Sequence, residues 1–110
     1  MGSGDGENLH LANAIKHWVA FRFKDDVSES DVRAILDGFA DFPRRYPAMH
    51  NWSMGLNVSD RDQTYTHAFS VEFDTEEGFR AFLSDEYHLT FVRERFRPAI
   101  STRAIVSYYF

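Results

Sequence analysis

The chain has 110 residues, 44% of them apolar, which is enough for one domain with a single hydrophobic core and too short for two. Its formal charge is −5, and no run of Lys and Arg alternates with aromatic residues, so we expect no nucleic-acid partner. Because cysteine is absent, the chain forms no disulfide and no thiolate or zinc–thiolate site. No apolar run approaches the ~20 residues that span a bilayer. The start lacks the pattern of a signal peptide, so we expect no membrane partner and a cytoplasmic location.

The first 13 residues are rich in Gly, Asn and small polar residues and show no periodicity. We interpret residues 1–13 as a disordered tail or as a remnant of an expression vector. From residue 15 the sequence alternates, which predicts a strand over residues 15–24. One side of this strand is apolar apart from one histidine, and carries Ile15, His17, Val19, Phe21 and Phe23. The other side places Trp18 and Ala20 between Lys and Arg.

The stretch "VSESDVRAILDGFADFP" predicts an amphipathic helix, with Ser28 as its N-cap and its end before Pro43. Alternation returns in "MHNWSMGLNV", which predicts a second strand over residues 49–57. A single unbroken alternation there places His50, Trp52 and Met54 on one side. The polar residues "SDRDQTY" then form a loop.

A third strand is predicted over residues 66–74, where "THAFSVEFD" alternates. Asp74 and Glu77 have the spacing of a capping box and introduce a second helix. This helix breaks at "SDE" and continues as a helical turn that carries His88 and stops at Pro98. The final segment, "TRAIVSYYF", reads as a fourth strand.

The resulting order is β-α-β-β-α-β, which predicts an α+β, ferredoxin-like fold with a four-stranded antiparallel sheet and helices on one face. The other face of the sheet would carry Trp18 on the first strand, with Trp52 and Met54 as candidates on the second. Such a face is too apolar to remain in water. Two copies meeting through it would form a homodimer, so we expect a dimeric α+β barrel.

Three segments resemble the stress-responsive A/B barrel domain family, called Dabb: "IKHWVAFRFKDDVSESDV", "YTHAFSVEFDTEEGFRAFL" and "HLTFVRERFRP". The resemblance identifies residues 14–110 as a single Dabb-like domain. It implies a dimeric ferredoxin-like barrel with a small pocket between the sheet and the helices of each subunit. The family includes plant stress proteins and many bacterial proteins of unassigned role.

This family also includes a plant cyclase of the olivetolic acid type, which uses a histidine as general base and a tyrosine to polarise its substrate. The histidine matches His88, within the motif His88-x-x-Phe91. The tyrosine falls at Phe82, which has no hydroxyl, so carbonyl polarisation would come from Tyr87, a backbone amide or water. The cyclase's late aspartate has no counterpart, because Ser107 or Tyr108 stands nearest.

His88 shares a helical face with Phe91 and Val92, so loss of solvation should lower its pKa and leave it a neutral proton acceptor. We name His88 as the candidate catalytic residue. The competing interpretation is a histidine that only caps the broken helix or lines the pocket. The remaining ligand-pocket residues that we predict are His17, Phe21, His67, Phe69, Phe82 and Phe91.

We predict no metal and no cofactor. The first residues of strands one and three would lie ~20 Å apart in full register, so His17, His67 and His88 make a weak metal site. No nucleotide-binding or hydrolase motif occurs. The predicted function is therefore a homodimer that binds a small apolar, aromatic or polyketide-like ligand, with cofactor-free acid–base catalysis as an option. The alternatives are a non-catalytic stress-related binding module and a cofactor-independent monooxygenase.

Overall fold

A computed structural model describes residues 14–110, and our expectation for residues 1–13 lies outside the described residues. The strands are β1 (Ile15–Phe23), β2 (Met49–Leu56), β3 (His67–Phe73) and β4 (Ile100–Tyr109). The α-helices are α2 (Glu29–Ala40), α3 (Phe42–Arg45), α4 (Glu76–Ser84) and α5 (Glu86–Phe91). A π-helical turn η1 (Val92–Phe96) and a 3₁₀ turn η2 (Arg97–Ala99) lead from α5 into β4.

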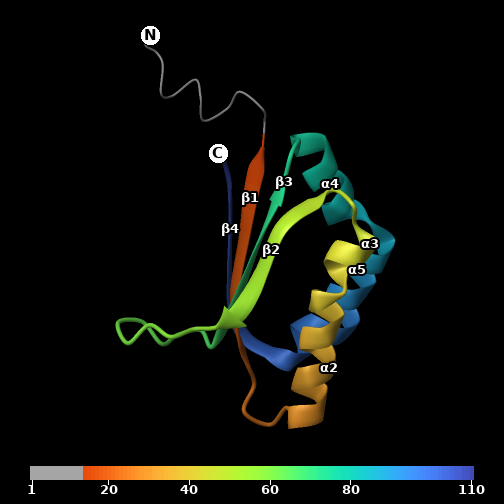
Figure 1. Cartoon of the computed structure of the whole chain (residues 1–110). Coiled ribbons are helices and arrows are strands. Elements are labelled where there is room, and N and C mark those ends of the chain that lie inside the picture. Colours follow the sequence, from red (N-terminus) through yellow and green to blue (C-terminus); the bar gives the residue numbers. More distant parts are fainter. Residues whose placement is uncertain (1–13) are drawn as a thin grey trace.

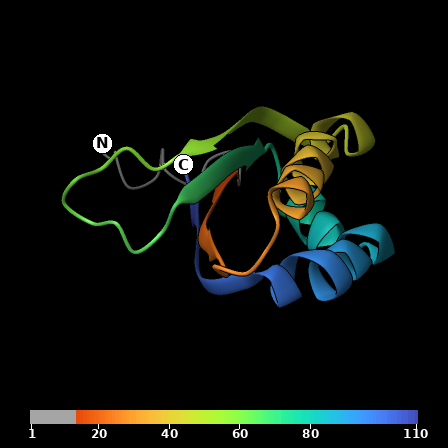
Figure 2. The same ribbon diagram turned by 90° about the horizontal axis from the view of Figure 1, so that it is seen from below.

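The four strands form one antiparallel sheet in the order β2-β3-β1-β4. Among residues 14–110, all of the helices lie on one face of this sheet, and none covers the opposite face (Figures 1 and 2). The loop between β2 and β3 extends away from the helical layer. The predicted ferredoxin-like α+β architecture is confirmed.

The helices begin where local chemistry satisfies their free N–H groups. Ser28 caps α2, as predicted, because its hydroxyl accepts a hydrogen bond from the amide of Asp31. The cap of α4 is Thr75, one residue beyond the predicted Asp74, and its hydroxyl accepts from the amide of Gly78 at 3.0 Å. Pro43 does not simply end α2, because it lies in the first turn of α3, where its missing N–H is not needed.

Phenylalanine side chains fill the space between the helices and the sheet. The bulkiest fully buried residues are Phe21, Phe42, Phe73 and Val71. Gly38 on α2 lets this core close, because a Cβ there would lie 2.5 Å from the ring of Phe91. The core is thus packed with aromatic rings in direct contact, and α2 lies too close to Phe91 for a side chain at residue 38.

Strand β2 contains a bulge that reverses its predicted alternation. The pairing with β3 shifts register between His50 and Ser53, and Asn51 adopts a φ of 52°. As a result Trp52 and Met54 pack against the core, and Trp52 stacks on Phe69 with 4.8 Å between ring centroids. The suggestion that both residues face away from the helices is therefore wrong.

Within residues 14–110, no helix has the length and apolar character needed to cross a bilayer.

Candidate functional site

A cavity of about 370 Å³ lies between the sheet and the helical layer. Strand pairing explains its floor: His17 lies opposite Ser107, and Val19 opposite Ile105, so β1 and β4 present these side chains to the same face. Six of its fifteen lining residues are phenylalanines. The complete lining consists of His17, Val19, Phe39, Phe42, Phe69, Phe79, Arg80, Phe82, Leu83, His88, Val92, Phe96, Arg103, Ile105 and Ser107.

The cavity gathers four of the seven residues named from sequence, His17, Phe69, Phe82 and His88. The other three residues do not line it. Phe21 is fully buried and stacks on His67 with 5.5 Å between the rings. Phe91 lies behind the wall, in contact with two phenylalanines that line the cavity, Phe39 and Phe42.

His17 is held on the floor of the cavity by the neighbouring strand. Its Nδ1 shares a hydrogen bond of 2.8 Å with the hydroxyl of Ser107, and its ring packs 5.3 Å from that of Phe79. Burial, and secondarily the charge of His88, lower the pKa of His17 to about 4. His17 is therefore a neutral imidazole at pH 7.

His88 lines the cavity from α5 and packs against Phe82 with the rings tilted by 35° and 4.0 Å between their centroids. Burial lowers the pKa of His88, against smaller opposing effects of backbone hydrogen bonding at Leu83 and Phe82 and of the charge of Asp85. Its Nδ1 is buried and has no hydrogen-bond partner among residues 14–110. The cavity lining thus contains a second imidazole whose protonation is disfavoured by burial, and its Nδ1 is enclosed by protein atoms without a hydrogen-bond partner.

Acidification is expected to destabilise the protein through these histidines. Between pH 6.5 and about 4 an unfolded His17 binds a proton and the folded one does not, so the free energy of unfolding falls as pH falls. At ~1.4 kcal/mol per pH unit, the loss from His17 is on the order of 3 kcal/mol. The pKa values of His67 and His88 are also lowered, so both residues act in the same direction.

Urea unfolding at intervals between pH 7 and pH 4.5 measures this loss of stability. The matched variant is His17→Gln. It should reduce the slope of the unfolding free energy against pH by up to ~1.4 kcal/mol per pH unit, which corresponds to one proton. An unchanged slope in this variant would contradict the assignment.

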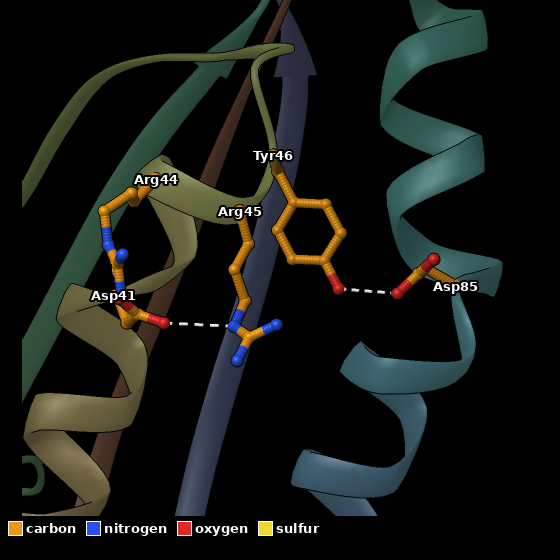
Figure 3. A network of polar contacts seen from close by, with 5 residues as sticks. All are labelled: Asp41, Arg44, Arg45, Tyr46 and Asp85. Carbon is orange, nitrogen blue, oxygen red and sulfur yellow. Dashed lines mark hydrogen bonds and ion pairs between the residues drawn. The ribbon is translucent and has the colours of Figure 1, made fainter.

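The helix that carries His88 is anchored at its N-cap, Asp85. Asp85 caps α5 by accepting from the amide of Tyr87, and it accepts a second hydrogen bond of 2.6 Å from the hydroxyl of Tyr46. Figure 3 shows Tyr46 aimed at Asp85 across the gap between α3 and the start of α5. The hydrogen bond from Tyr46 is the main reason that the pKa of Asp85 is lowered. Burial, followed by that same hydrogen bond, raises the pKa of Tyr46, so the pair stays phenol and carboxylate at pH 7.

The third histidine of the predicted set lies away from the other two. His67 is paired with Phe21, four residues along β1 from His17, which corresponds to about 13 Å at ~3.3 Å per residue. Its Nδ1 shares a hydrogen bond of 2.8 Å with the hydroxyl of Thr66. Within residues 14–110, no group of three or more His, Cys, Asp or Glu side chains is placed to hold a metal ion.

Sequence reasoning missed the contribution of β4 to the site. Arg103, Ile105 and Ser107 lie on alternate positions and all line the cavity. Their alternation was visible in "TRAIVSYYF", but the side that faces the helices follows only from the register of β4 against β1. Arg80 on α4 was also not named as a site residue.

Known proteins resemble this chain in sequence and in fold. Residues 15–110 match the family described as Stress responsive A/B Barrel Domain, abbreviated Dabb. The stress-response A/B barrel domain-containing protein At5g22580 of Arabidopsis thaliana is 30% identical over 82 residues, which cover 72% of this chain and 71% of that protein. Olivetolic acid cyclase of Cannabis sativa is 24% identical over 80 residues, which cover 71% of this chain and 79% of the cyclase.

Two solved structures show how widely the fold is shared. The hydroxynitrile lyase of Passiflora edulis has a TM-score of 0.82 and 24% identity, covering 90% of this chain and 94% of the lyase. A dimeric ferredoxin-like protein of unknown function from Thermobifida fusca has a TM-score of 0.74 and 24% identity, covering 88% of this chain and 91% of its own. At these identities the likeness concerns the fold alone.

Proposed function

Because the chain belongs to the stress-responsive A/B barrel domain (Dabb) family, whose members include an enzyme, we propose that its cavity binds a small apolar or aromatic, polyketide-like molecule and catalyses a cofactor-free acid–base reaction. His88 is the proposed base, and it removes a proton from a carbon next to a carbonyl group. The protein acts as a homodimer in this proposal.

The observation that carries this proposal is an imidazole whose protonation is disfavoured by burial, in the lining of a mainly apolar cavity. A base for carbon acids must be unprotonated at the working pH and within reach of the substrate. Burial supplies the first property, and the position of His88 in the cavity wall supplies the second. Ten of the lining side chains are apolar, which suits an apolar or aromatic ligand.

The step also needs a hydrogen-bond donor for the oxygen on which negative charge develops. Phe82 has no hydroxyl, so this role falls to another group in the cavity. His17 and Ser107 are hydrogen-bonded to each other on the floor and supply polar hydrogens there. In the proposed step His88 takes the proton, the C–H electron pair moves into an enolate, and the imidazolium later returns the proton.

Hydrogen–deuterium exchange at carbon tests the proposal without a known substrate. The probe is propiophenone, an aromatic ketone with slowly exchanging hydrogens next to its carbonyl, incubated with the protein in deuterium oxide. Proton NMR should show faster exchange with the protein than with buffer. The absence of any acceleration at millimolar ketone would overturn the catalytic part of the proposal.

A second candidate function, a non-catalytic binding module, is favoured by one feature of His88. The imidazole of a catalytic histidine is often oriented by a carboxylate, which also stabilises its protonated form. Within residues 14–110, no carboxylate oxygen is hydrogen-bonded to the His88 ring, whereas Asp85 binds Tyr46. Ligand binding without exchange of the ketone would support this module.

The uncovered face of the sheet supports the homodimer. Trp18 pairs with Val106, and the indole Nε1 of Trp18 donates to the hydroxyl of Tyr108, so these residues share the face away from the helices. They are 40%, 56% and 45% exposed, respectively. Large contiguous apolar areas of this kind usually mark an interface. Several structural neighbours are themselves described as dimeric.

Placing a lysine in this face is expected to separate the dimer. Val106→Lys would bury an unpaired ammonium group between two sheets, which costs several kcal/mol, so we expect a monomer at micromolar concentration. The matched control is Val58→Lys, because Val58 is 94% exposed in the loop after β2. Sedimentation velocity distinguishes the results. A monomeric wild-type chain, or a dimeric Val106→Lys variant, would contradict the proposed interface.

A further inference from the structure

The cavity has a charge that the composition of the chain does not suggest. The chain carries a formal charge of −5, and yet the cavity lining includes no Asp or Glu. It does include two arginines, Arg80 and Arg103. The cavity is therefore locally cationic within an acidic protein, and an anion entering it gains attraction that the overall charge would otherwise oppose.

The two arginines differ in whether their charge is already neutralised. Arg80 forms an ion pair of 3.2 Å with Glu76, one turn earlier on α4. Arg103 is half-buried on β4, and within residues 14–110 it has no ion pair and no hydrogen-bond acceptor. Arg103 is thus an uncompensated guanidinium facing an apolar space.

The surroundings of Arg103 disfavour its charge further. Burial, followed by repulsion from Arg97, lowers the pKa of Arg103. A partly buried charge without a partner is destabilising, and a ligand that supplies the opposite charge would offset that cost. A bound anion would relieve both effects.

We propose that the natural ligand is an organic acid, with an apolar or aromatic body in the cavity and a carboxylate on Arg103. This inference rests on the proposed function, because it names the class of molecule that the same cavity takes. The planar guanidinium matches a carboxylate through two parallel hydrogen bonds. A cavity of about 150 Å³ accommodates one benzene, so the observed volume of about 370 Å³ has room for a substituted ring.

The strand register also places the two ends of such a ligand. Arg103 lies four residues before Ser107 on β4, about 13 Å away at ~3.3 Å per residue, and Ile105 stands between them. The imidazole of His17 lies at the Ser107 end. A carboxylate on Arg103 therefore leaves several bonds of ligand between it and a carbon that reacts beside the histidines.

Binding of a matched acid and amide tests this proposal. The probes are 4-phenylbutanoate and 4-phenylbutanamide, which share the ring and chain and differ in charge, titrated into the full chain by isothermal calorimetry. The acid should bind the wild type more tightly than the amide. Arg103→Met should weaken binding of the acid by about tenfold or more, the usual range for a charge-assisted hydrogen bond, and leave the amide unchanged.

The control variant is Arg33→Met, which removes the same charge from an exposed position on α2, outside the lining of the cavity. Equal losses in the two variants would show a general charge effect and overturn the proposal. Equal binding of acid and amide to the wild type, or no binding of the acid at millimolar concentration, would also overturn it. Measuring the binding of either probe does not require the protein to be catalytically active. Ketone exchange that depends on His88, together with no preference for the acid, would overturn this inference alone.

Discussion

Replacing His88 with alanine should reduce protein-catalysed exchange of propiophenone by between about 100-fold and 10,000-fold, the range usual for loss of a general base. The imidazole of His88 is the group that would accept the proton, whereas the other neutral imidazole of the lining, His17, already shares its Nδ1 with the hydroxyl of Ser107. The loss should appear in the rate at saturating ketone. Proton NMR in deuterium oxide measures it directly.

The pH dependence gives a second signature of His88. Burial lowers its pKa, so the wild-type rate should decline with falling pH at a more acidic pH than an ordinary imidazole would give. His50→Ala is the matched control, because His50 is exposed and contacts Asp74 at 3.2 Å, outside the cavity lining. Undiminished exchange in His88→Ala, with unchanged thermal stability, would exclude His88 as the base.

Phe21→Ala should be the most destabilising single truncation, with a loss of about 3–5 kcal/mol in the free energy of unfolding. The side chain of Phe21 is fully buried. Its ring contacts two others closely, Phe23 at 5.5 Å and Phe96 at 5.0 Å between centroids. Removing it leaves a cavity that rigid neighbouring rings cannot fill. Urea unfolding followed by fluorescence measures the loss.

This experiment also decides between two roles of Phe21, since the sequence suggested that it lines the ligand pocket. A core role predicts a large loss of stability and unchanged probe affinity in the milder variant Phe21→Leu, which should remain folded. Leu56→Ala is the surface control, with an expected change within about 0.5 kcal/mol, because Leu56 is 71% exposed. Weakened binding of 4-phenylbutanoate to Phe21→Leu without loss of stability would restore Phe21 to the pocket.

The fold could be predicted because local signals agreed with one another along most of the chain. The alternation of β1 predicted a buried side that includes His17 and Phe21, and both are buried. The same reasoning failed for strand β2. One extra residue at Asn51 reverses which side of the sheet each later side chain of the strand faces. Asn tolerates a positive φ better than most residues, but an Asn in a strand sequence is not sufficient to predict a bulge.

The candidate site was only partly predictable, for a reason that concerns distance along strands. Two histidines on the same side of neighbouring strands need a known register before they can be placed together. The register separates His67 from His17 and instead brings Ser107 to His17. Arg103 escaped notice because an arginine near the end of a chain ordinarily reads as a solvated side chain.

The close approach of Gly38 to Phe91 means that the width of the cavity depends on a residue that does not line it. Phe91 packs behind Phe39 and Phe42, which line the cavity. The absence of a side chain at residue 38 therefore determines where Phe91, and with it these two rings, can lie. A methyl group at this position would push Phe91 toward Phe39 and Phe42 and narrow the cavity. Ligand size could therefore change through a helix position that no ligand touches.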